Sequence, residues 1–284
     1  MGSRPEAVAP PEIFYDDDTA RKYTSNSRNI QIQTSMTERA LELLNLPKDG
    51  VPKLLLDIGC GSGLSGEVIT ESGHHWVGLD IAPSMLDIAL DREVEGDLLL
   101  GDMGQGLGLR FGMFDGAIGI STIQWLCNAD KSFHNPHLRL KAFFTSLYKC
   151  LTNGARAVFQ VYPENDDQRE LLSSPAMKAG FSGGIVVDYK DSPKKRKEYL
   201  FLVCGQEVPL PLPEGRTEDN DDSGSETNKT VHVLDRRRPW KIQKNNKSEK
   251  GREWIKRKKE QMRRRGDDVP PDTKYTGRKR KNHF

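Results

Sequence analysis

A buried strand that runs directly into a glycine-rich turn constrains this chain more than any other feature of its sequence. Residues 54–58 are apolar apart from one acid, and Gly59, Gly61 and Gly63 follow at alternate positions. Glycine permits positive φ and close approach of the main chain to a ligand, whose polar groups then meet amides at the start of the next helix. The pattern predicts a nucleotide-type binding loop at the carboxyl end of the first strand of an α/β domain.

Short apolar runs bounded by Gly, Pro or Asp recur up to residue 205, as expected for strands buried on both faces of a sheet. Helix-compatible stretches alternate with them. This alternation predicts an α/β fold, a doubly wound and mostly parallel seven-stranded sheet with helices on both faces. The strands are expected at 53–58, 75–79, 97–100, 114–120, 155–162, 184–189 and 198–204, and the clearest helices at 65–72, 83–91, 138–151 and 167–179.

The charge is distributed very unevenly along the chain. The formal net charge is only +2, but residues 1–206 carry 21 Lys and Arg against 27 Asp and Glu, whereas residues 229–284 carry 21 against 7. We therefore expect a loose N-terminal arm (1–12), an acidic α/β domain (13–205), a disordered acidic linker (206–228) and a basic tail (229–284) that binds polyanions or directs nuclear import. Within the tail, 249–265 is compatible with a helix formed on contact with RNA or a partner.

Several classes of protein are disfavoured by what the sequence lacks. Its four cysteines are scattered singly and no histidines cluster beside them, so neither a disulfide framework nor a metal site is expected. No apolar run approaches the roughly 18 residues needed to cross a membrane. A reducing compartment without membrane attachment is the expectation.

The glycine spacing alone leaves two ligand classes open. Residues 61–66 match the G-x-G-x-x-G of dinucleotide-binding folds, and Asp80 follows about 20 residues later, as that pattern requires. Asp57, two residues before the first glycine, favours a different ligand, because an acid there would repel a pyrophosphate and attract a cationic amino or sulfonium group.

The element Leu-Asp-Ile-Gly-Cys-Gly-Ser-Gly, residues 56–63, resembles the first motif of class I methyltransferases. That resemblance implies S-adenosylmethionine as cofactor. It also implies that Asp80 accepts both ribose hydroxyls and that Asp102 meets the adenine amino group, with Ile81 and Met103 flanking the ring. A single Asp at a strand end often serves only as a helix cap, but three acids at successive strand ends favour the cofactor interpretation.

The segment 121–126, after the expected fourth strand, lies where the methyl acceptor belongs. It has no Asn/Asp-Pro-Pro-aromatic element of the kind used on exocyclic amines, and Cys127 lacks the preceding proline typical of pyrimidine C5 enzymes. A guanine N7 needs neither device, because its lone pair is already nucleophilic and positioning suffices. Trp125 is then expected to stack on the purine, with Gln124 and Ser121 helping to position it and no general base, although a simple core role for Trp125 is the alternative.

Elements along nearly the whole chain resemble the eukaryotic small-subunit rRNA guanine-N7 methyltransferases. They are residues 10–15, 20–23, 97–106, 124–128, 178–184 and 275–281. The resemblance implies methylation of one guanosine in small-subunit rRNA of the pre-ribosome, action in the nucleus or nucleolus and possible presence in the cytoplasm, and a heterodimer with a small zinc-ribbon activator protein. It further implies that residues 14–23 fold over the cofactor, with Tyr15 and Lys22 as contacts.

The expected third strand, 97–100, lies at a sheet edge in the usual class I order, so it would offer free backbone groups to such a partner. Two alternatives share the same motifs: a methyltransferase acting on tRNA or another RNA, and a ribosome-assembly factor whose main role is binding.

Overall fold

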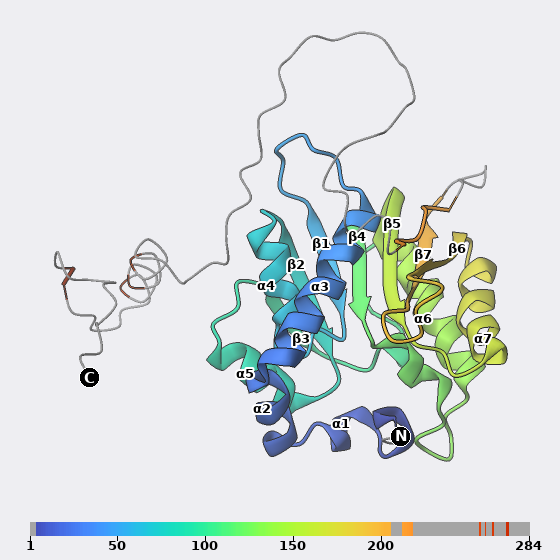
Figure 1. Ribbon diagram of the computed structural model, residues 1–284, viewed down its shortest axis with the longest axis horizontal. Coiled ribbons are helices and arrows are strands. Elements are labelled where there is room, and N and C mark those ends of the chain that lie inside the picture. Colours follow the sequence, from blue (N-terminus) through green and yellow to red (C-terminus); the bar gives the residue numbers. More distant parts are fainter. Residues whose placement is uncertain are drawn as a thin grey trace, which may run out of the picture. The chain divides into compact units, whose positions relative to one another are not determined.

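The computed structural model describes residues 4–205 and 212–217, together with Lys256, Lys259, Arg263, Pro271 and Asp272. The chain divides into two units, Met1–Glu226 and Thr227–Phe284. The first unit is built on a seven-stranded sheet in the order β3-β2-β1-β4-β5-β7-β6. Figure 1 shows this sheet between two layers of helices, which confirms the expected doubly wound class I methyltransferase architecture.

The strands alternate with helices along the chain, as their apolar runs predicted. The strands are β1 (Leu54–Ile58), β2 (His75–Asp80), β3 (Asp97–Leu100), β4 (Phe114–Ile120), β5 (Leu151–Val161), β6 (Ser182–Asp188) and β7 (Lys197–Val203). The helices are α1 (Pro11–Phe14), α2 (Asp17–Ser25), α3 (Ser27–Leu44), α4 (Leu64–Glu71), α5 (Pro83–Asp91), α6 (Pro136–Cys150) and α7 (Asp166–Lys178), with 3-10 turns η1 (Pro5–Ala7), η2 (Met103–Gln105) and η3 (Ile123–Cys127).

The central strand β1 is buried on both faces, because successive side chains of a strand point in opposite directions. Leu55 belongs to a cluster with residues of α3, α4 and α5, whereas Leu56 belongs to a second cluster with residues of α6 and α7. Each face of the sheet therefore has its own apolar core. Burial on both faces explains why β1 reads as a continuous apolar run rather than an alternating one.

The first five strands are parallel, and the last two form an antiparallel hairpin at one side of the sheet. After β5 the chain forms β6 at the edge of the sheet, and β7 then pairs between β5 and β6. The carboxyl ends of β1, β2, β3, β4 and β5 consequently meet at one edge of the sheet. Functional groups at these strand ends are brought together although they are far apart in the sequence.

Two sequence expectations about disorder are wrong for the described residues. Residues 4–12, expected to be a loose arm, contain η1 and the start of α1, and Glu6 is buried. Residues 212–217, expected to belong to a disordered linker, bind the domain: the Arg216 guanidinium pairs with Glu42, and its backbone amide donates to Asp188. Residues 4–12 are rich in Pro and small residues, and 212–217 contain few apolar residues, but polar partners on the domain hold both segments.

In the second unit, described by itself, Lys256, Lys259 and Arg263 are helical. Asp272 accepts hydrogen bonds from Lys259 at 3.3 Å and from Arg263 at 3.0 Å. The other residues of the expected linker and tail lie outside the described part of the chain. Among the residues that the structure describes, no helix combines the length and the apolar run needed to cross a membrane.

Helix α4 approaches the sheet closely because of Gly66. A Cβ atom on Gly66 would lie 2.0 Å from Cζ2 of Trp76, which fills the space between α4 and β2. Such a distance is far inside van der Waals contact, so only glycine lets the two elements pack at this separation. The third glycine of the 61–66 pattern thus serves helix–strand packing, as it does in dinucleotide folds.

We expect Gly66→Ala to destabilise the domain by about 1–3 kcal/mol, the usual cost of overpacking a core. Chemical denaturation should measure this loss. Because the clash is with the Trp76 ring, the smaller ring of Trp76→Phe should make Gly66→Ala less costly, and the double-mutant cycle should show that coupling. Equal stability of Gly66→Ala and the wild type would contradict the packing argument.

Candidate active site

A cavity of about 590 Å³ opens at the carboxyl edge of the sheet. It lies where β1 has neighbours on both sides, β2 and β4, so that the chain order reverses across it. This is the topological switch point at which open α/β sheets bind ligands. The volume is within the usual range for small-molecule sites.

Nine of the thirteen residues predicted for the site line this cavity, and four do not. The nine are Tyr15, Gly59, Gly61, Asp80, Ile81, Asp102, Met103, Ser121 and Trp125. The four that do not are Asp57, Gly63, Lys22 and Gln124.

The glycine loop is fixed against the end of β2. The backbone amides of Gly59 and Cys60 donate to the carbonyl of Leu79 at 2.7 and 3.2 Å. Gly59 has φ +70°, and a Cβ atom there would lie 2.2 Å from Cγ2 of Thr122. Glycine is therefore required both for the turn and for the close approach of Thr122, which precedes η3. Gly63, also at positive φ, precedes helix α4 and belongs to the scaffold of the loop.

Asp57 lies beneath the loop and not in the cavity, which corrects the expected direct contact with a ligand. Its side chain is fully buried, and Oδ2 accepts a hydrogen bond of 2.6 Å from Ser65 Oγ. Burial, together with the nearby Asp80 carboxylate, raises the pKa of Asp57 to about 7. Its role in the structure is to join β1 to the first turn of α4, directly below the glycines.

Asp80 lies on the cavity wall at the end of β2. Its two carboxylate oxygens accept hydrogen bonds from the backbone amides of Gly61 at 2.8 Å and Ala82 at 2.9 Å. Burial raises the pKa of Asp80, although these hydrogen bonds oppose the shift. Asp80 thus both holds the glycine loop and presents acceptor oxygens to the cavity beside Ile81.

Asp102, at the end of β3, belongs to a polar cluster that sequence reasoning missed. Its Oδ1 accepts hydrogen bonds from the Gly104 amide at 2.8 Å and from the Arg139 guanidinium at 2.6 Å. Arg139 also contacts His134 Nδ1 at 3.1 Å, and both residues line the cavity. Arg139 comes from α6, 37 residues later in the chain, and no local motif marks it.

The acceptor side of the cavity is formed by β4, β5 and η3. Ser121 has φ +60°, an uncommon conformation for a residue other than glycine, and its hydroxyl donates to the Gln160 side chain. Trp125 is largely buried but borders the cavity, with its ring centroid 6.1 Å from Phe14 and 6.2 Å from Tyr15. The expected base platform therefore belongs to an aromatic cluster shared with the N-terminal segment.

Two other residues of η3 that the sequence brought into consideration do not line the cavity. Gln124 is fully buried, because η3 turns its side chain into the protein, so a direct contact with an acceptor is not supported. Cys127 does not line the cavity, and burial raises the pKa of its thiol to about 12. A thiol that stays protonated is a poor nucleophile, which favours the packing role over the C5-methylation alternative.

The N-terminal segment covers the cavity, as the resemblance implied. Tyr15 lines the cavity, and burial raises its pKa. A hydrogen bond of 2.8 Å from Thr24 to Ser62 joins α2 to the glycine loop. Lys22, however, is exposed and away from the cavity, because it lies on the solvent side of α2.

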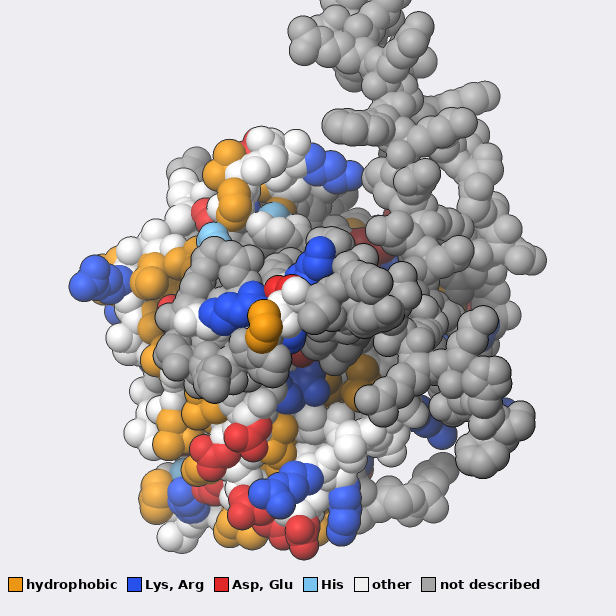
Figure 2. All heavy atoms as spheres, turned by 90° about the vertical axis from the view of Figure 1, so that its left-hand side faces the viewer, with side chains coloured by type: hydrophobic (Ala, Val, Ile, Leu, Met, Phe, Trp, Pro, Cys, Tyr) orange, Lys and Arg blue, Asp and Glu red, His pale blue; other side chains and the backbone are white. Residues whose placement is uncertain are grey.

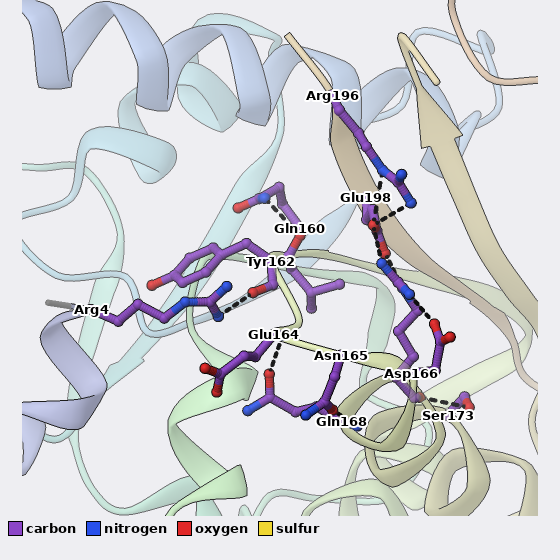
Figure 3. A network of polar contacts seen from close by, with 12 residues as sticks. Arg4, Gln160, Tyr162, Glu164, Asn165, Asp166, Gln168, Ser173, Arg196 and Glu198 are labelled. Atoms are coloured by element: carbon purple, nitrogen blue, oxygen red, sulfur yellow. Dashed lines mark hydrogen bonds and ion pairs between the residues drawn. The ribbon is translucent and has the colours of Figure 1, made fainter. Parts of the chain in front are cut away.

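Arg4 and Glu6 attach this segment to the acceptor side. Arg4 donates to the carbonyl of Tyr162 at 2.7 Å, as Figure 3 shows, and the Tyr162 hydroxyl donates to Glu6 at 3.2 Å. Pro5 and Tyr162 both line the cavity. None of these residues was predicted for the site, since their partners are more than 150 residues away along the chain.

Comparison with known proteins identifies the family. Two family models match: a methyltransferase domain over residues 56–159, and a methyltransferase involved in Williams-Beuren syndrome over residues 202–282. An 18S rRNA (guanine-N(7))-methyltransferase of Arabidopsis thaliana is 63% identical, with both chains covered completely. The corresponding protein of Mus musculus is 57% identical over 99% of this chain and 98% of its own.

The chain belongs to the 18S rRNA (guanine-N(7))-methyltransferase family. The similarity includes the residues beyond 205, so the basic tail belongs to the family pattern as well. Among solved structures, phosphoethanolamine N-methyltransferase 2 of Haemonchus contortus has a TM-score of 0.51 at 15% identity, covering 68% of this chain and 58% of its own. Magnesium protoporphyrin IX methyltransferase of Synechocystis has a TM-score of 0.50 at 16% identity, covering 72% and 99%. At such identities these structures support the class I fold alone.

The buried carboxyl group of Asp57 should make stability depend on pH. Its pKa rises from 3.8 when solvated to about 7 in the fold, so the folded protein pays an increasing cost as pH rises from about 4 to about 7. Asp57→Asn carries no charge and can still accept from Ser65. We expect the melting temperature of this variant, relative to wild type, to increase across that range and then level off.

The matched control is Asp91→Asn, an exposed aspartate at the end of α5. This variant removes a carboxylate from an exposed position, and so measures the effect of an Asp-to-Asn change on the melting temperature without the burial. A flat profile for Asp57→Asn would show that Asp57 is not held in the environment described.

Proposed function

We propose that this protein transfers a methyl group from S-adenosylmethionine to N7 of a guanosine in small-subunit rRNA. The observation that carries the proposal is the similarity to curated 18S rRNA (guanine-N(7))-methyltransferases along the entire chain, including one of Saccharomyces cerevisiae at 50% identity. The cavity supports it, because it has a polar, acid-lined end for a cofactor and an aromatic end for a base.

The cofactor end is formed by groups suited to a neutral ribose and an adenine. Asp80 and Asp102 provide acceptor oxygens, and Ile81 and Met103 provide apolar contact on either side of a ring. The glycine loop brings backbone rather than side chains to the cavity wall at Gly59 and Gly61. S-adenosylmethionine, when bound, supplies the electrophilic methyl group.

The acceptor end needs to position a base and not to deprotonate it. The N7 lone pair of guanine carries no proton, so the rate depends on holding that atom in line with the methyl group at near-attack distance. Trp125 offers a ring for stacking, and the Ser121–Gln160 pair forms a polar wall beside it. Closure of residues 4–25 over the cavity excludes water from the reacting atoms.

Variants at the two ends of the cavity should separate cofactor binding from base binding. Asp80→Asn should weaken S-adenosylmethionine binding by at least about 1.5 kcal/mol, the lower end for a hydrogen bond to a charged group. Trp125→Ala should leave this affinity nearly unchanged and raise the KM for rRNA roughly 5- to 150-fold, equivalent to a stacking loss of about 1–3 kcal/mol. Trp125→Phe, which keeps a ring, should lie between.

Calorimetry measures the affinity for S-adenosylmethionine. Quantifying N7-methylated guanosines at increasing rRNA concentrations gives the KM for rRNA. Melting curves of each variant control for loss of fold. Unchanged cofactor affinity in Asp80→Asn would contradict the ribose assignment, and the absence of any N7-methylated guanosine with wild-type protein would contradict the function.

We also propose a heterodimer with a small zinc-ribbon activator protein that adds to the sheet at β3. Strand β3 ends the sheet order, with β2 as its neighbour. Its residues Leu99 and Leu100 are 37% and 63% exposed. Figure 2 faces this side of the molecule, and hydrophobic side chains are visible on it among charged ones. An apolar edge strand of this kind favours pairing with another chain.

A charge at this edge should damage the heterodimer. Leu100→Glu should reduce co-purification with the zinc-ribbon protein, because strand addition would bury the new carboxylate. Leu138→Glu on α6 is the matched control, since Leu138 is 64% exposed. Equal complex yields from the two variants would show that the partner, if it binds, does not use β3.

The basic tail and the location of the protein complete the proposal. Residues 229–284, with 21 Lys and Arg against 7 acids, contact rRNA phosphates and direct the protein to the nucleus. The family match over residues 202–282 supports a shared role for this segment. An acidic domain would otherwise be repelled by RNA.

A further inference from the structure

The connection between β6 and β7 carries a concentration of positive charge on an otherwise acidic domain. Residues 189–197, here called the cationic loop, comprise this connection and the first residue of β7, and contain five Lys and Arg and one Asp. Lys190, Lys194, Lys195 and Arg196 are exposed. Residues 1–206 as a whole have six more acids than cations. The loop therefore differs from the rest of the domain in the sign of its net charge as well as in its density of charged residues.

The cationic loop lies at the rim of the cavity. Pro193, Arg196 and Lys197 line the cavity directly. The start of β7 pairs with the end of β5, where Gln160 is opposite Tyr199 and Val161 is opposite Glu198. Gln160 accepts the hydrogen bond from Ser121, so the loop ends next to the acceptor side of the cavity.

Both ends of the loop are held by buried carboxylates that arginines neutralise. Asp188, at the end of β6, accepts from Arg39 Nε at 2.9 Å and Nη2 at 3.0 Å. Glu198, in β7, accepts from Arg169 Nε and Nη2, each at 2.8 Å, and from Arg196 at 3.1 Å. Figure 3 shows Arg196 reaching Glu198 on one side of Gln160 and Tyr162.

The cationic loop has a defined conformation between these two anchors. Although burial disfavours its charged form, hydrogen bonds from Arg169 and Arg196 lower the pKa of Glu198, which therefore remains ionised and keeps its arginine partners. Within the loop, the amides of Lys195 and Arg196 donate to the Ser192 carbonyl at 3.0 and 2.8 Å. The loop is thus preformed, and ligand binding would not have to offset an entropic cost of ordering it.

The N-terminal segment at the same cavity contributes acids rather than lysines. Glu12 lines the cavity and forms an ion pair with Lys131, whose Nζ is 3.2 Å from Glu12 Oε1. Asp16, Asp17 and Asp18 follow at the start of α2 but do not line the cavity.

We propose that the cationic loop binds the phosphates of the rRNA nucleotides that flank the methylated guanosine. The inference rests on the proposed function, because a guanosine that enters the cavity within an RNA must bring its neighbouring phosphates across the rim. RNA fits the loop better than an acidic protein does, because a guanosine in the cavity brings its own phosphates to the rim. The loop then binds RNA next to the reacting base, in addition to any binding by the tail.

The test compares two triple variants of the full-length protein with equal change of charge. In the first, Lys190, Lys194 and Lys195 are each replaced by Ala. In the control, Lys48, Lys149 and Lys178 are replaced by Ala; these exposed lysines precede β1, β5 and β6 at the other end of the sheet. A third variant replaces the loop lysines by Arg and keeps the charge.

The dissociation constant for unmodified 18S rRNA transcribed in vitro is measured over a salt series. For every phosphate that the protein no longer neutralises, the slope of log affinity against log salt should decrease by about 0.7. We expect a shallower slope and a higher KM for rRNA in the loop Ala variant, wild-type slopes in the control and the Arg variant, and unchanged affinity for S-adenosylmethionine in all three.

Equal slopes for the loop Ala variant and the control would overturn the proposal, as would a shallower slope in the Arg variant. Neither outcome depends on methylation. If wild-type protein methylates no guanosine N7 in this rRNA, the proposed function fails, whereas the salt slopes still decide whether the loop binds phosphates.

Discussion

Burial of β1 on both faces is the constraint on which the rest of the structure depends. Two apolar cores, one beneath α3, α4 and α5 and the other beneath α6 and α7, contact opposite sides of the same short strand. A strand covered in this way can place polar groups only at its ends. Because β1, β2, β3, β4 and β5 are parallel, the acids and glycines at their carboxyl ends converge on one cavity.

The three acids at these strand ends have different roles because they are buried to different extents. Asp57 is enclosed completely and joins β1 to α4. Asp80 holds the glycine loop through Gly61 and still reaches the cavity. Asp102 is oriented by Arg139, which approaches from the other side of the site. Similar sequence positions thus have distinct environments, and only the acids that face the cavity can contact a ligand.

Two buried carboxylates near the cavity are paired with arginines, and the rim beside them is positive. Buried carboxylates such as Asp188 and Glu198 are paired with arginines, which avoids the high cost of an isolated buried charge. The lysines beside them face outward. A domain with a net negative charge therefore has a local concentration of positive charge at the side of the cavity where the cationic loop lies.

The sequence by itself determined the fold class, the positions of all seven strands and the glycine loop, because these depend on periodicity and on conformations that only glycine adopts easily. The position of Trp125 after the fourth strand marked it as a base platform, and the family resemblance added the cover over the cofactor site. Only the tertiary structure decided that Asp57 lies under the loop, that Lys22 and Gln124 are away from the cavity, and that Arg139, Tyr162 and the cationic loop border it. Those facts depend on side-chain direction and on contacts between residues far apart in the chain. A local sequence pattern determines neither the side-chain direction nor the long-range contacts.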